Sequence, residues 1–566
     1  MSMPIRVVTS RPWQVVWLLV CLLTAAAAEV AHGQYPRIPE DVRIRSEAEK
    51  AAADRRSDEA FARALPAIEA WAAKGKPFLQ GVSRPDQLPQ ATIPAFPGAE
   101  GAGRHSFGGR GGKVMVVTSL DDSGPGTFRE ACEAGGPRIV VFNVAGIIRL
   151  KDRIRIRAPY ITIDGSSAPG DGVCIAGNTV ELDTHDVVIR HMRFRRGATD
   201  VGDRNDSIGG NPIGNVMIDH VSASWGLDEN MSMYRHMYHP PDGSKDLKLP
   251  TVNITIQESI FSEGLNTFHH AFGSTIGGTN CTFMRNLWAN NTGRNPSMGM
   301  GGDFNYVNNV IFNWRHRTTD GGDGTSRVNS INNYFKPGPG TPVDRPIGHR
   351  ILKAESRTKP PADKEFGKFH VAGNVIEGNE AVTAENWAGG VQFADAEDIR
   401  GEDLEAYNRR YIEQSRMAEP FPMAPMTIHS AKDAYEHVLA NAGATLPRRD
   451  AIDERIVQTV RTGDVGPPQP EADLHDKLDR VGYTAERVEE LVRLVPLGFI
   501  TDPAQVGGYP EYAGTPHADA DSDGMPDDYE KAHGLNPRDA ADAAIDADGD
   551  GYTAIEAFLY RLTPQK

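Results

Sequence analysis

The sequence predicts an all-β fold for the middle of the chain, a solenoid of the parallel β-helix type. From about Ala95 onward, short β-branched and aromatic runs alternate with Gly, Asn and Asp for roughly 300 residues. A polar residue stands at a corresponding place in successive runs: His191, His220, Glu258, Asn286, Asn309, Asn333 and Asn374. The closest of these lie about 23 to 24 residues apart, a length typical of one solenoid coil.

Stacked coils account for these polar positions. In a parallel β-helix each coil lies on the last, so equivalent residues line up and internal Asn side chains can bond the neighbours above and below. Longer gaps then correspond to loops inserted between coils. An antiparallel sandwich or propeller would share the turn residues, but it should show hairpin dipeptides and period-two alternation more consistently.

The chain is too long for one compact core, so we expect an elongated domain with appendages. The predicted segments are a signal peptide (1–28), a helical lead and linker (29–94), the β-helix (95–380), a helical extension (381–510) and a calcium-binding module (511–566).

The first residues are typical of a secretory signal. Arg6 and Arg11 precede a short apolar run, and small residues allow cleavage near Ala28. The alternative is one uncleaved membrane anchor, although the run is short for a bilayer span of about 20 residues. We therefore expect a secreted protein, extracellular or periplasmic, with no membrane span in the mature chain.

Helical patterns flank the β-rich region. Phe61, Leu65, Ile68 and Trp71 lie at helical spacing in the lead. In the extension, Ser430 and Asp433 form a capping box and Gly443 ends the helix. Two more helices are predicted over residues 450–461 and 484–495.

Charge and cysteine content restrict the partners. A formal charge of −16 argues against nucleic acid, whose phosphates require a basic surface. An acidic protein can still bind a polycarboxylate if Ca²⁺ bridges the two. Beyond the leader only Cys132, Cys174 and Cys281 remain, an odd number that predicts buried free thiols rather than a disulfide framework.

A family resemblance covers roughly residues 95 to 380. The ordered motifs AFPGAEGAGRHSFGGRGGKVMVVTSLDDSGPGTFREA, ITIDGSSAPG, VVIRHMRF, NVMIDHVSASWGLDEN and NTGRNP resemble the pectate lyase family of polysaccharide lyases. The resemblance implies a right-handed parallel β-helix, calcium, a polygalacturonate or related polyuronide substrate, and cleavage by β-elimination.

Two acidic groups are candidates for the calcium site that such chemistry needs. β-Elimination removes the proton on C5, alpha to a carboxylate, and a cation bound to that carboxylate makes the proton more acidic. Asp203 and Asp206 precede one strand, and Asp228 and Glu229 precede the next, so adjacent coils can bring them together. Asp206 matches the family's calcium aspartate. Relatives often carry another carboxylate where this chain has Ser232 or Met233. Because this chain lacks that ligand, we expect calcium to arrive with the substrate rather than to be held permanently. The alternative is that these acidic residues are solvated loop residues that bind no metal.

The motif NTGRNP supplies the candidate base. Resemblance assigns Arg294 as the group that takes the C5 proton, although a guanidinium stays protonated near neutrality unless neighbouring cations disfavour its charge. If it stays charged, it would clamp the carboxylate or stabilise the intermediate. Gly299 stands where relatives carry a second arginine. His269 and His270 are candidate substrate contacts, whereas Asp219 and His220 are predicted to be structural.

The carboxyl-terminal segment carries two loops of EF-hand type. The first has D-x-D-x-D-G spacing with acidic residues at positions nine and twelve, and the second is imperfect because Glu556 falls one position early. The candidate ligands are Asp519, Asp521, Asp523, Asp527 and Glu530 in the first loop, and Asp546, Asp548, Asp550 and Glu556 in the second. A structural calcium module is the prediction; a disordered acidic tail and a dockerin-like attachment module are the alternatives.

Two other functions stay open at this point. A β-helical polygalacturonase would hydrolyse the same polymer with aspartates such as Asp203, Asp206 and Asp228. A noncatalytic polysaccharide-binding β-helix would keep the coils and the calcium loops but lack a base. We expect a monomer in each case.

Overall fold

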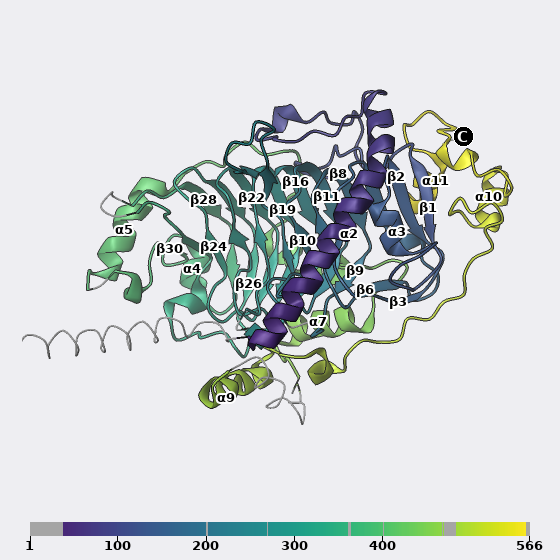
Figure 1. Cartoon of the computed structure of the whole chain (residues 1–566). Coiled ribbons are helices and arrows are strands. Elements are labelled where there is room, and N and C mark those ends of the chain that lie inside the picture. Colours follow the sequence, from purple (N-terminus) through teal and green to yellow (C-terminus); the bar gives the residue numbers. More distant parts are fainter. Residues whose placement is uncertain are drawn as a thin grey trace, which may run out of the picture.

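The protein is described by a computed structural model that covers residues 38–561 except 200–201, 269, 360–363, 400, 467 and 469–482. The predicted signal peptide and His269 lie outside the described residues. The middle of the chain is the predicted parallel β-solenoid, which runs from the β1 end to the β28 and β30 end (Figure 1).

Three parallel sheets form the walls of the solenoid. The first contains β1 (Lys113–Val117), β2 (Arg138–Phe142), β5 (Ile161–Asp164), β8 (His185–Arg190), β11 (Gly214–Asp219), β16 (Val252–Gln257), β19 (Thr279–Met284), β22 (Asp303–Val307), β25 (Arg327–Ile331) and β28 (Lys368–Ala372). The second contains β3 (Gly146–Arg149), β6 (Val173–Ala176), β9 (Arg193–Arg195), β12 (Ser222–Ser224), β17 (Ile260–Ser262), β20 (Leu287–Ala289), β23 (Val310–Phe312), β26 (Tyr334–Lys336) and β29 (Val375–Ile376).

The third wall consists of two shorter ladders joined by a bridge between Met233 and Ile276. Its strands are β4 (Ile154–Ile156), β7 (Val180–Leu182), β10 (Ile208–Gly210), β13 (Met231–Ser232), β18 (Thr275–Ile276), β21 (Ser297–Met298), β24 (Thr319–Gly321), β27 (Leu352–Ala354) and β30 (Val391–Gln392). A separate antiparallel hairpin pairs β14 (Arg235–Tyr238) with β15 (Leu247–Pro250).

Apolar side chains from all three walls fill the lumen. Ile163, Phe194, Val216, Phe283 and Trp288 belong to one continuous core and are essentially inaccessible to water. Each such side chain contributes about 1.5–3 kcal/mol relative to exposure. Cys132, Cys174 and Cys281 are buried free thiols, as the odd cysteine count predicted.

The Asn ladder is confirmed for its last four members. Asn286 donates to Asn309 (3.1 Å), Asn309 to Asn333 (3.0 Å) and Asn333 to Asn374 (2.8 Å) through side-chain amides. Because each amide group is satisfied by the next coil, the column fixes the coil register.

The predicted register is wrong by one residue in the first three coils. The backbone N–H of Ser259 donates to Asn286 Oδ1 at 3.0 Å, and the backbone N–H of Val221 donates to Ser259 Oγ at 3.1 Å. The ladder therefore continues through Ser259. His191, His220 and Glu258 belong to the adjacent outer column, where their φ angles of 50°, 51° and 49° turn the chain at the corner. Both columns repeat once per coil, so spacing alone does not distinguish them.

Helices cover the outside of the solenoid. The long helix α2 (Glu40–Ala72) crosses the front in Figure 1 and is tied to the region of β4 by ion pairs such as Arg153 to Asp54. The predicted extension helices are confirmed as α6 (Ala431–Asn441), α7 (Ala451–Thr462) and α9 (Ala485–Leu494), with Ser430 Oγ accepting from Asp433 N at 3.2 Å.

The remaining helices are short. They are α3 (Phe128–Glu133), α4 (Glu380–Ala384), α5 (Leu404–Ser415), α10 (Asp527–His533), α11 (Ala554–Tyr560), and the 3-10 turns η1 (Pro85–Gln87), η2 (Gly165–Ser167), η3 (Asn266–Phe268), η4 (Pro346–His349), η5 (Ala396–Asp398), η6 (Val495–Leu497), η7 (Pro503–Val506) and η8 (Asp542–Ala544). Among the described residues no helix is both long and apolar enough to cross a membrane.

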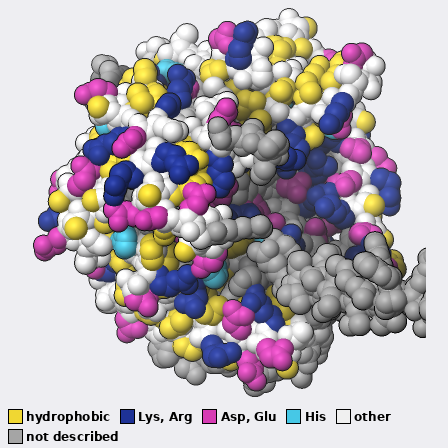
Figure 2. Space-filling view, turned by 90° about the vertical axis from the view of Figure 1, so that its left-hand side faces the viewer, with side chains coloured by type: hydrophobic (Ala, Val, Ile, Leu, Met, Phe, Trp, Pro, Cys, Tyr) yellow, Lys and Arg dark blue, Asp and Glu magenta, His cyan; other side chains and the backbone are white. Residues whose placement is uncertain are grey.

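The protein surface carries basic as well as acidic side chains, despite the net negative charge. Figure 2 shows Lys and Arg side chains interspersed with Asp and Glu over one face, and several of the basic groups border a hollow. A polyanion can therefore meet positive groups on an acidic protein.

Candidate active site

Three carboxylates meet where the second wall turns into the third. Asp206 lies just before β10, and Asp228 and Glu229 lie between β12 and β13, which pairs with β10. One oxygen from each lies within 4.8 Å of the others, and Glu229 N donates to Asp206 Oδ1 at 3.1 Å. The predicted convergence of acids from adjacent coils is therefore present for these three residues.

Repulsion within this acidic trio, Asp206, Asp228 and Glu229, makes it a candidate site for a cation. Burial, with the charges of Glu229 and Asp228, raises the pKa of Asp206 well above its usual value. Burial and Glu229 raise the pKa of Asp228 to about 7, against the opposing charges of Arg204 and Arg294. Hard divalent cations select clustered carboxylate oxygens, so the trio fits calcium chemically.

Asp203 is not part of the trio. Its carboxylate accepts from Asn205 Nδ2 at 3.0 Å and lies 4.0 Å from Lys50 Nζ on α2. The sequence placed it near Asp206 because only two residues separate them, but the intervening loop turns its side chain toward the long helix.

Arg294 contacts the trio directly. It precedes β21, and its Nη1 donates to Glu229 Oε1, which also accepts from Thr275 Oγ1 at 2.8 Å. Burial alone would lower the pKa of Arg294, but the Glu229 carboxylate outweighs it and raises that pKa. Glu229 therefore holds the guanidinium in its charged form.

An aromatic ring separates Arg294 from a second arginine. The guanidinium carbons of Arg294 and Arg317 lie 4.5 and 4.9 Å from the Phe272 ring centroid. Both arginine side chains stay partly exposed, at 25% and 30%. Phe272 and Arg317 were not predicted as site residues, although Phe272 stands only two residues after His270.

His270 supports the trio rather than lining an open surface. It is 4% exposed, its Nε2 lies 3.2 Å from Asp228 Oδ1, and its ring packs 4.4 Å from Phe272. This placement lets His270 position Asp228, and its role as a substrate contact stays a prediction.

The missing arginine at Gly299 has a spatial counterpart. A Cβ on Gly299 would lie 2.3 Å from the Tyr234 ring, so this position has no room for a side chain. Arg357 Nη2 donates to the Gly299 carbonyl oxygen at 2.7 Å. A guanidinium from another coil therefore reaches the same place.

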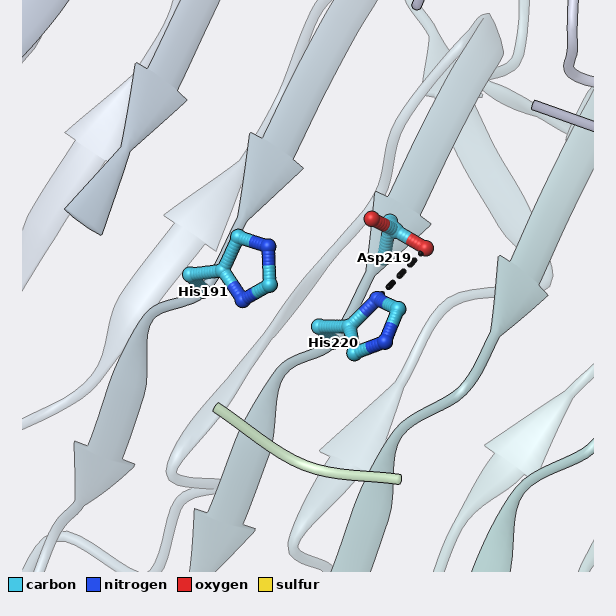
Figure 3. A group of neighbouring side chains, drawn as sticks. All are labelled: His191, Asp219 and His220. Atoms are coloured by element: carbon cyan, nitrogen blue, oxygen red, sulfur yellow. Dashed lines mark ion pairs between the residues drawn. The ribbon is translucent and has the colours of Figure 1, made fainter. Parts of the chain in front are cut away.

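A further cluster outside the acidic trio is His191, Asp219 and His220, whose polar atoms lie within 4.8 Å of one another (Figure 3). Asp219 Oδ1 lies 2.9 Å from His220 Nδ1 and accepts from Gln257 Nε2 at 2.8 Å, and Oδ2 accepts from Arg190 Nε at 3.1 Å. Burial opposes ionisation, but His220 and Arg190 keep the pKa of Asp219 below its usual value. Its charge is thus already compensated, as expected for a structural residue.

The first carboxyl-terminal loop also gathers its acids. Asp519, Asp521 and Asp523 form one group within 4.8 Å, and Asp523, Glu530 and Asp542 form another. Asp527 instead accepts from Ala520 N at 2.9 Å and lies 3.7 Å from Lys531. Asp542 stands 12 residues after Glu530, the last position of the loop, so the loop motif did not identify it.

The second loop brings Asp546, Asp548 and Asp550 together in an exposed group. The prediction that Glu556 joins them is wrong. Glu556 is 2% exposed, bonds Arg110 Nε at 2.9 Å and caps α11 through Thr553 N at 3.0 Å. Arg110 is distant in sequence and could not be anticipated from the loop.

Comparisons with known proteins agree with these features. No protein-family model matches the chain. Curated relatives include a probable pectate lyase C from Aspergillus flavus, 33% identical over 84% of this chain and 95% of its own length, and one from Aspergillus oryzae, 32% identical over 84% and 95%. A probable pectate lyase from Arabidopsis thaliana is 26% identical over 44% of this chain and 49% of its own length.

Solved structures are more distant. The major allergen of cedar pollen, jun a 1, is 17% identical over 61% of this chain and 92% of that chain, with a TM-score of 0.39. A pectate lyase bound to a hexasaccharide is 13% identical over 52% and 69%, with a TM-score of 0.32. The assignment rests on the sequence relatives, which match almost from end to end. The chain therefore belongs to the pectate lyase family of polysaccharide lyases.

Proposed function

We propose that the chain is a secreted, calcium-dependent pectate lyase that cleaves α-1,4-polygalacturonate by β-elimination and leaves 4,5-unsaturated oligogalacturonates. The observation that carries this proposal is the contact between Arg294 and a trio of converging carboxylates. Secretion rests on the predicted leader, residues 1–28, and polygalacturonate is the substrate that the relatives' names suggest.

Asp206, Asp228 and Glu229 are the residues that would hold calcium. Their mutual repulsion is relieved by a divalent cation, and no other described residue group combines this acidity with a neighbouring arginine of the NTGRNP motif. When bound, calcium supplies Lewis-acid polarisation of the substrate carboxylate.

Arg294 is the group that we assign to the C5 proton. In the structure, Glu229 holds the guanidinium charged. A cation held by the trio would take up the charge of Glu229, and the like charge of Arg317, which packs on the same Phe272 ring, disfavours the protonated form of Arg294 further. Once the Arg294 guanidinium has released a proton to solvent, it accepts the C5 proton. The C5–H electron pair forms the C4–C5 double bond, and the C4–O bond breaks with its electron pair leaving on the glycosidic oxygen, which takes a proton from solvent.

The basic side chains near the trio explain how an acidic protein binds a polyanion. Arg294, Arg317 and Arg204 keep 25%, 30% and 34% of their side-chain surface exposed. Partly exposed guanidinium groups bind carboxylates in a two-pronged geometry. Substrate binding therefore rests on local charge rather than on the net charge of −16.

Hydrolysis is the competing reaction. An inverting hydrolase separates its two carboxyl groups by roughly 6.5–9.5 Å so that a water fits between them. The nearest oxygens of Asp206 and Asp228 lie within 4.8 Å, and Asp203 faces away, so the arrangement does not fit an inverting hydrolase. The arginine beside the trio, rather than this spacing, favours elimination over a retaining hydrolase.

The test is ultraviolet absorbance of conjugated uronate product during incubation with polygalacturonate. The wild-type protein should produce this absorbance with Ca²⁺ and not with chelator, and Arg294→Ala should lose it. New reducing ends without absorbance would overturn the proposal in favour of hydrolysis. Binding without either product would leave a polysaccharide-binding role.

A further inference from the structure

The carboxyl-terminal module contains five carboxylates that form two adjoining groups with one shared member. The first group is Asp519, Asp521 and Asp523, and the second is Asp523, Glu530 and Asp542. Within each group, one carboxylate oxygen of every residue lies within 4.8 Å of the others. Four of these residues belong to the EF-hand type loop. The fifth, Asp542, belongs to η8, outside that loop.

Three of these carboxylates, Asp523, Glu530 and Asp542, are buried, and each has at least one oxygen without a hydrogen-bond partner among the described residues. Glu530 is 0% exposed and Asp523 is 2% exposed, and both Glu530 oxygens, both Asp521 oxygens and Asp523 Oδ2 lack a hydrogen-bond partner among the described residues. Within the same described part of the chain, no Lys or Arg forms an ion pair with any of the five. Burying several unpaired carboxylates costs desolvation free energy that a bound cation would offset. The geometry therefore indicates a cation site.

Asp542 is oriented for this role. Its Oδ2 accepts from Asn536 N at 2.7 Å, whereas its Oδ1 is buried and lacks a partner. One oxygen thus fixes the side chain, and the other is directed to the acidic group. An EF-hand type loop can take ligands from outside its own twelve positions if they are oxygen donors at the right place.

The same loop is the contact between the module and the first coils. Met525, at loop position seven, is 0% exposed and packs with Ile139 and Val141 on β2 and with Ile555 and Leu559 of α11. Gly524 has a φ of +89°, and a Cβ there would lie 2.6 Å from Val141 Cγ2. In Figure 1 the module, in yellow, lies beside β1 at that end of the solenoid.

We propose that Asp519, Asp521, Asp523, Glu530 and Asp542 form a structural calcium site, and that the bound ion locks the module over the outer face of β1 and β2. The ion fixes the loop that carries Gly524 and Met525, so binding and docking are one event. The site is separate from the trio around Asp206, and its role is stability rather than turnover.

The first experiment compares thermal unfolding and calcium binding of the full chain with those of Asp542→Asn. In Ca²⁺ the variant should melt lower and bind the ion about tenfold more weakly, because one charged ligand is lost. In chelator it should melt at the same temperature as the wild type or higher, because a repelling charge is gone. Asp528→Asn, which removes an exposed charge on α10, should match the wild type in both conditions.

A purely structural Asp542 would give a different pattern. If its bond to Asn536 N alone mattered, the variant would lose the same stability with and without Ca²⁺, and this outcome would overturn the proposal. If Asp542→Asn does not fold in chelator, Asp521→Asn replaces it, since both Asp521 oxygens lack partners.

Hydrogen exchange tests the docking step. Ca²⁺ should slow exchange in residues 113–117 and 138–142 of the wild-type protein, and the effect should be lost in Asp542→Asn. Calcium binding that leaves exchange in these two strands unchanged would refute the lock. Calcium at the Asp206 trio does not confuse the result, because that trio is intact in both proteins.

Discussion

Arg294 donates to Glu229, a carboxylate that also belongs to the group formed with Asp206 and Asp228, so the predicted base and the predicted cation site share one side chain. Whatever changes the charge of Glu229 also changes how strongly Arg294 retains its proton. This shared carboxylate would couple metal binding to the chemistry, and the predictions about activity follow from it.

Replacing Arg294 should nearly abolish activity. Arg294→Ala removes both the proton acceptor and the charge next to the substrate carboxylate, so kcat should fall about a thousandfold or more. Initial rates from product absorbance give the comparison, with Arg461→Ala, an exposed surface arginine, as control. Retention of a tenth of the wild-type rate in Arg294→Ala would mean that another group takes the proton.

Glu229→Gln should increase the calcium requirement. The neutral amide contributes less to the cation and no longer offsets the charge of Arg294, so the Ca²⁺ concentration for half-maximal rate should rise about tenfold. A calcium titration of the initial rate measures this shift. The control is Glu385→Gln, whose side chain is 52% exposed and distant from the trio; equal shifts in both variants would contradict the role of Glu229.

Arg317 and Arg357 should contribute to substrate binding rather than to the proton transfer. Each partly exposed guanidinium contributes about 1 kcal/mol to binding a carboxylate, so Arg317→Ala and Arg357→Ala should each raise KM roughly fivefold with kcat little changed. The increase should shrink at high salt, because screening weakens such pairs. A fall in kcat at constant KM would instead place the arginine in the chemical step.

The Asn ladder should be costly to interrupt. Asn309→Ala removes the acceptor of the Asn286 backbone N–H (3.0 Å) and of its side-chain amide (3.1 Å). It also removes one donor to Asn333 Oδ1 (3.0 Å) and the donor to Phe283 O (2.9 Å). Unfolding free energy in urea should fall by about 3 kcal/mol or more, since each orphaned buried group costs about 1–3 kcal/mol. Asn441→Ala on the exposed face of α6 should change it by less than about 0.5 kcal/mol.

Acid should loosen the extension helices from the solenoid. Asp450 caps α7 and pairs with Arg195 on β9 at 2.8 Å; burial alone would raise its pKa, but Arg195 and Arg193 lower it to about 2. A lowered carboxyl pKa gives stability that is present above the unfolded value of about 4 and is lost as pH falls toward 2.

Urea midpoints between pH 2 and pH 7 test this dependence. The contribution lost on acidification should be about 2 kcal/mol, and Asp450→Asn should remove that part of the pH dependence while lowering stability at neutral pH. An unchanged pH profile in the variant would show that other carboxyl groups control acid unfolding.

The sequence could predict features that depend on local periodicity. The coil repeat, the Asn column from Asn286 onward and the capped helix after Ser430 all follow from spacing and capping chemistry, and the structure has them. The register of His191, His220 and Glu258 could not be fixed, because two adjacent columns share one repeat.

Contacts between distant residues were beyond sequence reasoning. Arg357 reaches Gly299 from another coil, and Arg110 captures Glu556 from the far end of the chain. Asp542 completes an acidic group from outside its motif. Each depends on how the coils stack and where the module docks, which no local pattern records.

Digestion of polygalacturonate in heavy-oxygen water, with Ca²⁺ and analysis of the products by mass spectrometry, tests the central claim most directly. Elimination breaks the C4–O bond without adding water, so each cut should give one unsaturated fragment, lighter by one water than its hydrolytic counterpart, and should add no heavy oxygen to either fragment. Saturated fragments with one heavy oxygen atom at each newly formed reducing end would contradict the account and make the enzyme a hydrolase.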